Sequence, residues 1–364
     1  MTTLFVAGIL DNRETGYGVH TSDLLDALRR VSPWPIEAID MGSRRTTGGY
    51  PGPDDVVVCV GTPELLTLFK PTGARLISLT MWESTVIPDG WHLPFSLADE
   101  IWTASDWGAD VLRRNIARPH RVHVVPAGVD GAAFRPHGPT LPMIDRIEGF
   151  KFLHVGKAEP RKGTVELLYA FDRAFDDEPV YLVLACHNRF IPGFDTVRFL
   201  ENMCLRRRRF IVPVQPLPDR SAVGALYRSC DAFVAPSRAE GWGLPALEAM
   251  ASGLPTALTR YGGHAAFAHP GNSVGIPYTM APIDRGALPA LERADGNYGE
   301  WAAPDIDGLA GTLRSMAGGL YAERRMAAQA SAAEIAERWS WDAAAQEACM
   351  RVGSILGGQL RKAG

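Results

Sequence analysis

The sequence predicts an α/β protein with two doubly wound domains, each built on a parallel sheet that helices cover on both faces. Short strands rich in valine and isoleucine alternate with amphipathic helical segments, and strands that are apolar on both faces are typical of buried parallel sheets. The pattern starts again near residue 151, after a stretch with linker composition. A chain of 364 residues is also long enough for two hydrophobic cores.

The first half of the chain alternates predicted strands with helices. Helices are expected at 19–30 and 106–114, where apolar residues recur at helical spacing. The expected strands are 4–9, 55–60, 75–80, 100–104 and 122–125. The segment 134–147 contains three prolines and a glycine, which indicates a linker.

The second half repeats this alternation. Its expected strands are 151–155, 181–185, 210–214, 232–234 and 255–258. The region 278–304 is rich in proline and glycine and is left unassigned. The tail, 322–356, is rich in alanine and glutamate and predicts two helices that separate near residues 339–341.

Composition excludes several classes of protein. A hydrophobic content of 46% with 21% charged residues is ordinary for a soluble globular chain, and a net charge of −4 argues against a nucleic-acid binder. The five cysteines form no CxxC pair, so neither a zinc site nor a disulfide framework is expected. No apolar run approaches the roughly 18 residues of a membrane span. We therefore expect a cytoplasmic protein.

Three loops have compositions that suit ligand binding. In open α/β sheets ligands lie outside the carboxyl ends of the strands, where loops lead into helices. The first such loop, 11–20, contains Gly16 and Gly18, which would let a phosphate or sugar approach the backbone at a helix N-terminus. A flexible turn explains these two glycines equally well.

The second loop, 154–163, places two cations beside a helix N-terminus. Gly156 follows the predicted strand, and Arg161 and Lys162 precede Gly163. A guanidinium binds phosphate oxygens in a forked geometry and an ammonium adds a point charge, so the pair suits a diphosphate. The alternative is a solvated basic turn.

The third loop, 236–253, carries glycines, a first-turn proline and two carboxylates. Backbone amides near Gly243 would form an anion site at the helix N-terminus, and Pro245 favours a helix start there. Glu240 and Glu248 can both reach one pocket without touching each other, and carboxylates accept hydrogen bonds from sugar diols. A favourable charge near the helix start is the alternative for Glu248, and it does not explain Glu240.

The segment 237–257 (SRAEGWGLPALEAMASGLPTA) resembles the E-x7-E signature of the family-four retaining glycosyltransferases of GT-B fold. Three other segments resemble family motifs in the same order: RVHVVPAGVDGAAFRP at 121–136, FLHVGKAEPRKG at 152–163 and LYRSCDAFVAPS at 226–237. The resemblance covers nearly the whole chain. Its Trp82-Glu83 segment and residues 301–305 are similar to those of bacterial polysaccharide-assembly members.

This resemblance implies two Rossmann-like domains facing each other across a cleft. An acceptor-side domain at 1–138 is joined by a C-terminal helix, 341–364, that crosses back to it, and 139–340 binds the nucleotide-sugar donor. The implied reaction moves a hexose, with retention, from a nucleotide-diphosphate sugar to a hydroxyl of a glycan or lipid-linked acceptor. GDP-mannose is favoured slightly over UDP-sugars. No metal, cofactor or nucleic acid is implied, and peripheral attachment at the inner face of the membrane is compatible.

The resemblance also assigns roles to residues. Arg161 and Lys162 match the pair that stabilises the leaving diphosphate, Glu240 the contact to the transferred sugar, and Glu248 the ribose ligand. The remaining implied substrate-binding residues are Gly16, Gly18, Gly156, Leu217 near the base, Gly241, Trp242, Gly243 and Leu244.

One position departs from the family. Many members carry a histidine on the first domain, facing the anomeric centre, but residues 79–84 contain none. Glu83 is the candidate for this acceptor-side role, and a surface glutamate is nearly as good an interpretation. His20 and His92 are weaker substitutes.

Two other functions stay open. One is a GT-B-like sugar phosphorylase or a non-transferring nucleotide-sugar enzyme. The other is a non-catalytic protein that binds a nucleotide sugar or glycan, although the cations and glutamates are intact. A dinucleotide dehydrogenase is disfavoured, because no G-x-G-x-x-G follows a strand with an acidic residue at the required distance.

Overall fold

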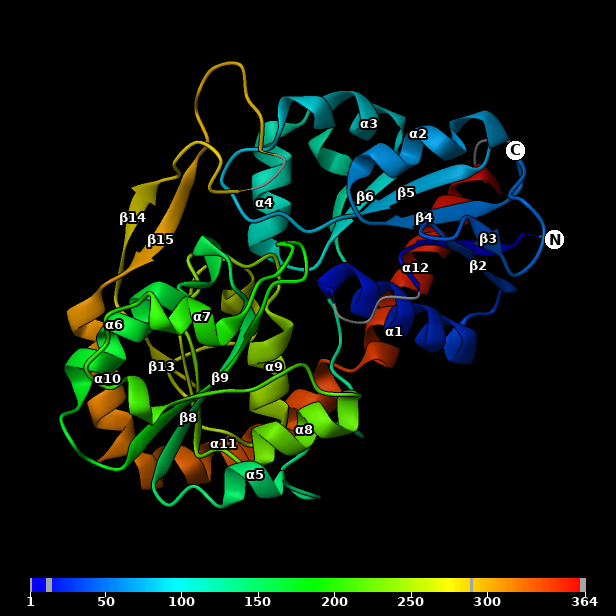
Figure 1. Ribbon diagram of the computed structural model, residues 1–364. Helices are drawn as coiled ribbons and strands as arrows, with labels where there is room; N and C mark the ends of the chain where they lie inside the picture. The colour runs from blue at the N-terminus through cyan, green and yellow to red at the C-terminus, as the bar shows by residue number, and fades with distance from the viewer. Residues whose placement is uncertain (1, 11–14, 289–290, 361–364) are drawn as a thin grey trace. The chain divides into compact units, whose positions relative to one another are not determined.

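The computed structural model describes residues 2–10, 15–288 and 291–360, which form two units (Figure 1). Unit 1 comprises Met1–Gly128, Pro289–Gly299 and Arg338–Gly364, and unit 2 comprises Val129–Leu288 and Glu300–Glu337. Each unit contains its own central sheet, as the alternation of strands and helices predicts.

Among the described residues, the sheet of unit 1 has seven strands in the order β3-β2-β1-β4-β5-β6-β7. All neighbours are parallel except β2 and β3. The strands are β1 (Leu4–Gly8), β2 (Ile36–Asp40), β3 (Arg45–Thr46), β4 (Val56–Val60), β5 (Arg75–Leu79), β6 (Glu100–Thr103) and β7 (Val122–Val124). The five predicted strands of this half are present. The sequence analysis missed β2, because Glu37 and Asp40 interrupt its apolar pattern.

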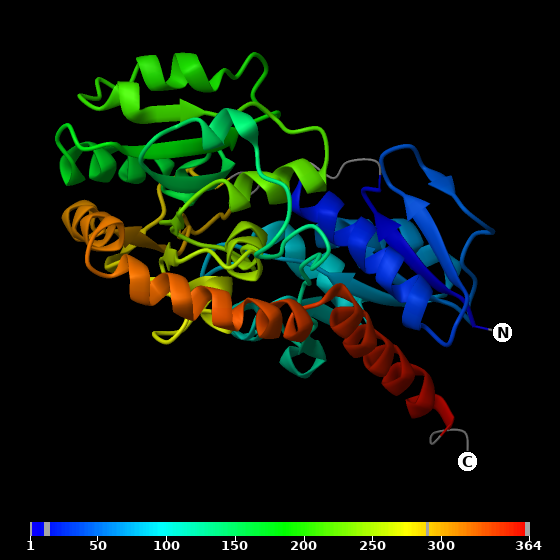
Figure 2. The ribbon, with the colours of Figure 1, turned by 90° about the horizontal axis from the view of Figure 1, so that it is seen from below.

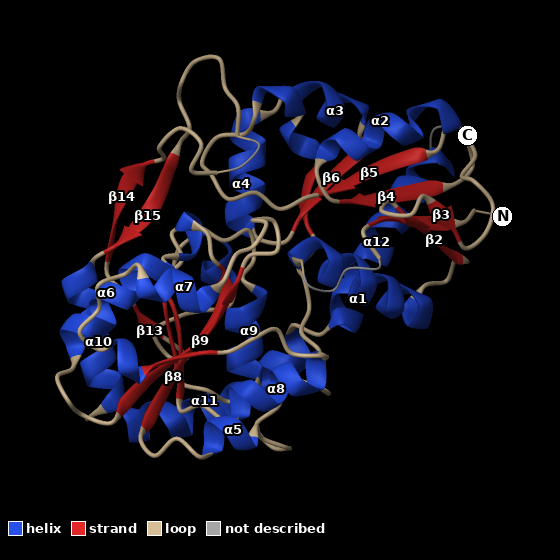
Figure 3. Cartoon of the chain, in the orientation of Figure 1, coloured by secondary structure: helices blue, strands red, loops and turns tan. Residues whose placement is uncertain are grey.

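Helices cover both faces of this sheet (Figure 3). They are α1 (Gly16–Val31), α2 (Leu66–Phe69), α3 (His92–Leu97), α4 (Asp106–Asn115) and α12 (Trp341–Leu360), with short 3₁₀ turns η1 (Pro63–Leu65), η2 (Lys70–Thr72), η3 (Asp89–Trp91) and η4 (Pro119–Arg121). Side-chain caps start the longer ones: Thr15 accepts a hydrogen bond from the Gly18 amide, and Ser105 accepts one from the Gly108 amide.

The last helix, α12 (red in Figure 2), packs in unit 1 although the strands of that unit lie far earlier in the chain. Arg351 pairs with Glu100 of β6, and Trp341 meets the His20 ring of α1 edge-on with centroids 5.1 Å apart. A Cβ on Gly128 would lie 2.4 Å from the Trp341 amide nitrogen, so only glycine allows this close approach.

In the part of unit 2 that the structure describes, the sheet has six strands, all parallel, in the order β10-β9-β8-β11-β12-β13. They are β8 (Phe150–Lys157), β9 (Val180–His187), β10 (Ile211–Pro213), β11 (Ala232–Ala235), β12 (Thr256–Leu258) and β13 (Val274–Gly275). A separate antiparallel pair, β14 (Tyr278–Pro282) and β15 (Glu300–Pro304), occupies the region left unassigned from sequence.

Helices also cover both faces of the unit 2 sheet, with α6 and α10 packed against each other (Figure 3). The elements are α5 (Pro142–Asp145), α6 (Thr164–Ala174), α7 (Thr196–Glu201), α8 (Arg220–Arg228), α9 (Leu244–Ala251), α10 (Ile306–Ala317) and α11 (Tyr321–Arg338), with η5 (Pro160–Lys162), η6 (Arg208–Phe210) and η7 (Gly262–Ala266). Phe152, Leu168 and Phe171 lie in the buried core between α6 and the sheet.

The division between the units differs from the predicted one between residues 138 and 139. It falls after Gly128, because the following residues pack on α8: Arg228 Nη1 donates to the Ala133 carbonyl at 2.9 Å, and Phe134 meets Tyr227 edge-on. Pro289–Gly299 joins unit 1, where the Tyr298 carbonyl accepts a hydrogen bond from Ser84 Oγ at 2.8 Å. The amino-acid composition did not indicate that this late segment of the chain belongs to unit 1.

Candidate active site

The second and third predicted loops lie side by side in unit 2. They follow β8 and β11, which are neighbours in the sheet, so both loops leave the same edge at the carboxyl ends of the strands. The first predicted loop follows β1 in unit 1. Its residues 11–14 lie outside the described part of the chain.

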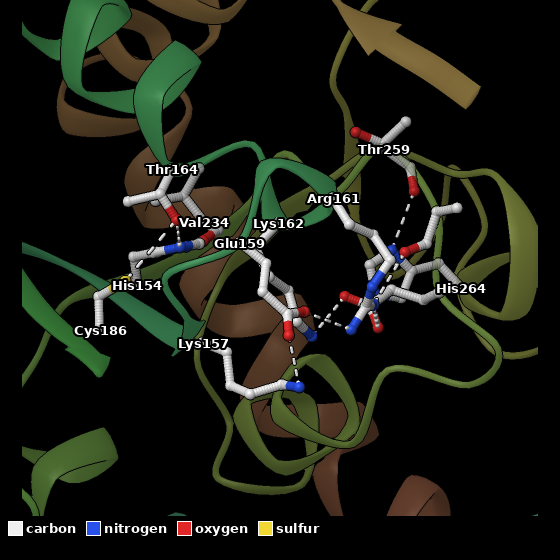
Figure 4. Close-up of polar contacts among 12 residues, drawn as sticks. His154, Lys157, Glu159, Arg161, Lys162, Thr164, Cys186, Val234, Thr259 and His264 are labelled. Atoms are coloured by element: carbon white, nitrogen blue, oxygen red, sulfur yellow. Dashed lines mark hydrogen bonds and ion pairs between the residues drawn. The ribbon is translucent and has the colours of Figure 1, made fainter. Parts of the chain in front are cut away.

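Two cations of the second loop, Arg161 and Lys162 (labelled in Figure 4), form ion pairs with one carboxylate of the third loop. Lys162 Nζ lies 2.7 Å from Glu240 Oε1, and Arg161 Nη1 lies 2.9 Å from Glu240 Oε2. The three residues are between 6% and 9% exposed, so the alternative of a solvated basic turn is wrong. Burial alone would raise the pKa of Glu240, but Lys162 and Arg161 hold it well below its usual range. Glu240 is therefore ionised.

A second carboxylate extends this cluster. Glu159 pairs with Arg161 Nη2 at 3.2 Å and with Lys157 Nζ at 2.5 Å. The cluster thus contains three cations and two carboxylates, which leaves one positive charge in excess. Because the charges are held before any ligand arrives, an anion would meet oriented donors rather than flexible ones.

Gly163 makes the approach of the two loops possible. Its φ of 65° is left-handed, and a Cβ there would lie 2.0 Å from the Pro236 carbonyl oxygen. The backbones are also joined directly, since the Arg238 amide donates to the Arg161 carbonyl at 2.7 Å. Gly156 lies beside the stem of Lys162, where a Cβ would be 3.4 Å from the Lys162 Cδ.

A double glycine in η7 supports the backbone of the third loop. The Gly263 amide donates to the Glu240 carbonyl at 2.7 Å. A Cβ on Gly263 would lie 2.5 Å from the backbone of Gly241 and Trp242. Gly243, with φ 101°, caps α9 just before Leu244, so this segment presents the N-terminus of a helix beside the charged cluster.

Glu248 has different partners from Glu240. Tyr227 Oη donates to Glu248 Oε2 at 3.0 Å, and Arg220 Nη2 lies 3.8 Å from Oε1. Burial and the charge of Glu248 raise the pKa of Tyr227 well above its usual range. Glu248 lies beyond the first turn of α9, so a favourable charge at the helix start does not explain it. Leu217 lies half-buried in the loop between β10 and α8.

In unit 1, Tyr17 joins the first loop to the loop after β5. Its hydroxyl donates to the Met81 carbonyl at 2.9 Å and accepts from the Met81 amide at 3.1 Å. Burial of that hydroxyl raises the pKa of Tyr17 to about 12, with a smaller effect from Glu83. Gly16 and Gly18 flank this tyrosine at the start of α1, and Glu83 is half-buried next to it. Tyr17 was not predicted from the sequence as a residue of this site, although its position between two glycines could have indicated it.

The two substitute histidines do not resemble catalytic groups. His20 is fully buried against Trp341, and burial lowers its pKa to about 3, which keeps the imidazole neutral in the core of unit 1. His92 is exposed at the start of α3.

Two buried histidines in unit 2 were missed. His154 of β8 contacts the Val234 carbonyl through Nδ1 at 2.9 Å and Thr164 Oγ1 through Nε2 at 3.1 Å, and burial lowers its pKa to about 4. It thereby ties β8 and β11 to the start of α6. His264 of η7 lies against Gly243, with its Nδ1 3.0 Å from the Thr259 carbonyl (Figure 4). The position of His264 directly after two glycines could have indicated from the sequence that it belongs to the site.

Within 2–10, 15–288 and 291–360, no three or more His, Cys, Asp or Glu side chains gather as a metal site would require. None of the helices in these ranges is long and apolar enough to cross a bilayer.

Sequence comparison matches part of the chain. Residues 146–278 match the family model described as "Glycosyl transferases group 1". D-inositol 3-phosphate glycosyltransferase of Corynebacterium glutamicum (strain R) is 33% identical over 166 residues, which are 42% of this chain and 39% of that protein. MMP alpha-(1->4)-mannosyltransferase of Mycolicibacterium hassiacum is 29% identical over 187 residues, 51% of this chain and 43% of that protein. The match thus spans less than half of either relative.

Structural comparison extends over the whole chain. Sucrose-phosphate synthase of Thermosynechococcus elongatus superposes with a TM-score of 0.69 at 16% identity and covers 100% of both chains. Anabaena HepE in complex with UDP-glucose gives a TM-score of 0.69 at 14% identity, covering 97% of this chain and 99% of that one. Residues 146–278 therefore match the glycosyl transferases group 1 family model, and the chain as a whole has the GT-B fold.

Proposed function

We propose that this chain is a retaining glycosyltransferase that moves a hexose from a nucleotide-diphosphate sugar to a hydroxyl of a glycan or lipid-linked acceptor. The observation that supports it most is the buried cluster in which Arg161 and Lys162 share the carboxylate of Glu240. All three residues lie inside the segment that matches the glycosyltransferase family.

The charges of this cluster suit loss of a diphosphate from a sugar. As the bond from the anomeric carbon to the diphosphate breaks, negative charge grows on the leaving oxygen, and fixed cations stabilise it without rearranging. Arg161 offers a planar fork and Lys162 a point charge, which together match phosphate oxygens. Glu240, held ionised, can accept hydrogen bonds from hydroxyls of the sugar being transferred.

The other predicted residues complete the proposal. Glu248, positioned by Tyr227, holds the ribose, and the backbone from Gly241 to Leu244 cradles the phosphates and sugar. In unit 1, Glu83 provides the acceptor-side polar group. The acceptor hydroxyl attacks from the face that the diphosphate leaves, and a leaving-group oxygen takes its proton, so that configuration is retained. We propose that no metal takes part.

GDP-mannose is the first donor to test. One relative in the matched region is named a mannosyltransferase, which supports a mannosyl donor. UDP-sugars are the alternative, because a protein of the same fold was solved with UDP-glucose.

A panel of nucleoside diphosphates and nucleotide sugars, screened by thermal stabilisation, tests the proposal. A ligand that binds only the folded state raises the melting temperature. The stabilising nucleotide sugar is then incubated with and without glycan acceptors, and free sugar and product are quantified. Acceptor-dependent transfer with retained configuration is expected.

Other results would favour the rival functions. Release of a sugar phosphate that requires inorganic phosphate would indicate a phosphorylase. Stabilisation without turnover across a broad acceptor set would indicate a binding protein, and the absence of stabilisation by any nucleotide would overturn the proposal.

A further inference from the structure

His264 sits against the charged cluster in a fixed protonation state. Its Nδ1 lies 3.0 Å from the Thr259 carbonyl oxygen, and since a carbonyl can only accept, Nδ1 carries the proton. The side chain is 1% exposed. Burial lowers the pKa of His264, and the nearby carboxylate of Glu240 opposes this only in part. The ring is thus neutral, with an unprotonated Nε2.

That second nitrogen faces the N-terminus of α9. A Cβ at Gly243 would lie 2.4 Å from both Cδ2 and Nε2 of the ring, so the imidazole edge rests on the Gly243 α-carbon. Within the ranges that the structure describes, Nε2 has no hydrogen-bond partner. Nε2 is not among the fully buried side-chain atoms that lack a partner, so it keeps some exposure and a ligand group can reach it.

The unprotonated Nε2 of His264 can bind only a group that donates a hydrogen bond. A lone pair repels phosphate oxygens, which are themselves acceptors, and attracts a hydroxyl hydrogen. Arg161 and Lys162 already supply donors for phosphate, whereas Nε2 adds a second acceptor beside Glu240. Nitrogen and carboxylate together therefore suit the hydroxyls of a sugar.

We propose that His264 is a specificity-determining residue for the transferred sugar, one hydroxyl of which donates a hydrogen bond to Nε2. This inference rests on the proposed function and adds a named contact to it. Neighbouring Glu240 recognises the sugar as well, so the two acceptors together discriminate among hexoses. The ribose is held elsewhere in the proposal, by Glu248.

Two variants separate this contact from structural support. His264→Asn keeps a donor near the Nδ1 position for the Thr259 carbonyl and removes Nε2. His264→Gln places an amide oxygen near the Nε2 position and serves as the conservative rescue. The probes are the nucleotide sugar that wild type uses, its singly deoxygenated hexose analogues and the free nucleoside diphosphate.

The expected results form a pattern. For the natural donor, His264→Asn lowers kcat/KM on the order of tenfold, as loss of one hydrogen bond does, and His264→Gln recovers part of it. For one deoxy donor, the kcat/KM of wild type falls by about as much as the kcat/KM of His264→Asn falls for the natural donor. When His264→Asn is given that same deoxy donor, its kcat/KM falls little further, because the hydroxyl and Nε2 belong to the same hydrogen bond. Calorimetry shows free nucleoside diphosphate bound about equally by all three proteins, as expected if neither phosphate nor ribose touches His264.

Distinct outcomes overturn the inference. Equal losses of nucleoside diphosphate and nucleotide-sugar binding would assign His264 to the phosphates, the ribose or loop support. Fully additive effects of every deoxy donor and the Asn substitution would show that no hydroxyl meets Nε2, while the proposed transferase function stands. Wild-type protein that neither binds nor uses any nucleotide sugar would instead overturn the proposed function itself.

Discussion

Replacing Lys162 with methionine tests the charged cluster most directly. Lys162 is 9% exposed, and its Nζ lies 2.7 Å from Glu240 Oε1. Methionine keeps most of the aliphatic stem and removes the charge, so Glu240 is left with Arg161 alone at 2.9 Å. Loss of one charged hydrogen bond between buried partners should lower the free energy of unfolding by about 1–3 kcal/mol.

The effect on catalysis should be larger than that on stability. If Lys162 stabilises the leaving diphosphate, its loss costs about 3 kcal/mol in the transition state, or on the order of 100-fold in kcat. Steady-state transfer kinetics with the identified donor measure this. A Lys162→Met enzyme with wild-type kcat would show that the diphosphate is not bound at this cluster.

The stability loss should depend on pH with a defined sign. The folded pKa of Glu240 lies well below its ordinary value of 4.5, because Lys162 and Arg161 outweigh the effect of burial. Such a carboxylate contributes stability that is fully present above about pH 4.5 and is lost as the pH falls toward the folded value. Urea unfolding should therefore show the greatest difference between wild type and Lys162→Met near neutral pH, and a smaller one near pH 3.

Lys157→Met is the matched control in the same loop. Lys157 pairs with Glu159, not with Glu240, and its side chain is 35% exposed, so about 0–1 kcal/mol of stability is at stake. Its kcat should fall much less than that of Lys162→Met, because Lys157 pairs with Glu159 at the more exposed edge of the cluster. Equal losses in the two variants would mean that the net charge of the loop matters and the contact to Glu240 does not.

Three further predictions address the metal, the glutamates and the last helix. Transfer should survive excess EDTA; abolition by EDTA with rescue by Mn²⁺ or Mg²⁺ would contradict the proposed role of the cations. Glu248→Ala should mainly raise the donor KM and weaken the binding of nucleoside diphosphate. Glu240→Ala should mainly lower kcat, and it should bind nucleoside diphosphate as tightly as wild type or more tightly, because Arg161 and Lys162 lose a competing anion. Calorimetry that shows the reverse would exchange the roles of the two glutamates. Truncation before Ser340 should lower the melting temperature, because α12 buries apolar residues in unit 1; an unchanged melting temperature would make the helix dispensable.

Local patterns in the sequence determined the class of fold and most strands. The valine-rich run of β4 is buried on both faces, as are Phe152 and Leu153 of β8, and such burial leaves a continuous apolar run in the chain. Glycines in the first turn of α1 and just before α9 marked the places where loops lead into helices. Strand β2, with its charged residues, and the pair β14–β15 carried no such trace.

Only the tertiary structure decided which of the predicted residues meet. Glu240 lies 79 residues from Arg161 and 78 from Lys162 in the chain, and they touch because β8 and β11 are neighbours in the sheet. Tyr17, after β1, reaches Met81, after β5, across 64 residues because only β4 lies between these two strands in the sheet. The order of the strands arises from the packing of whole helices and strands, which the periodicity of the sequence does not encode. For this reason Arg161, Lys162 and Glu240 could be predicted separately from the sequence, but their ion pairs could not. His264 was not predicted at all.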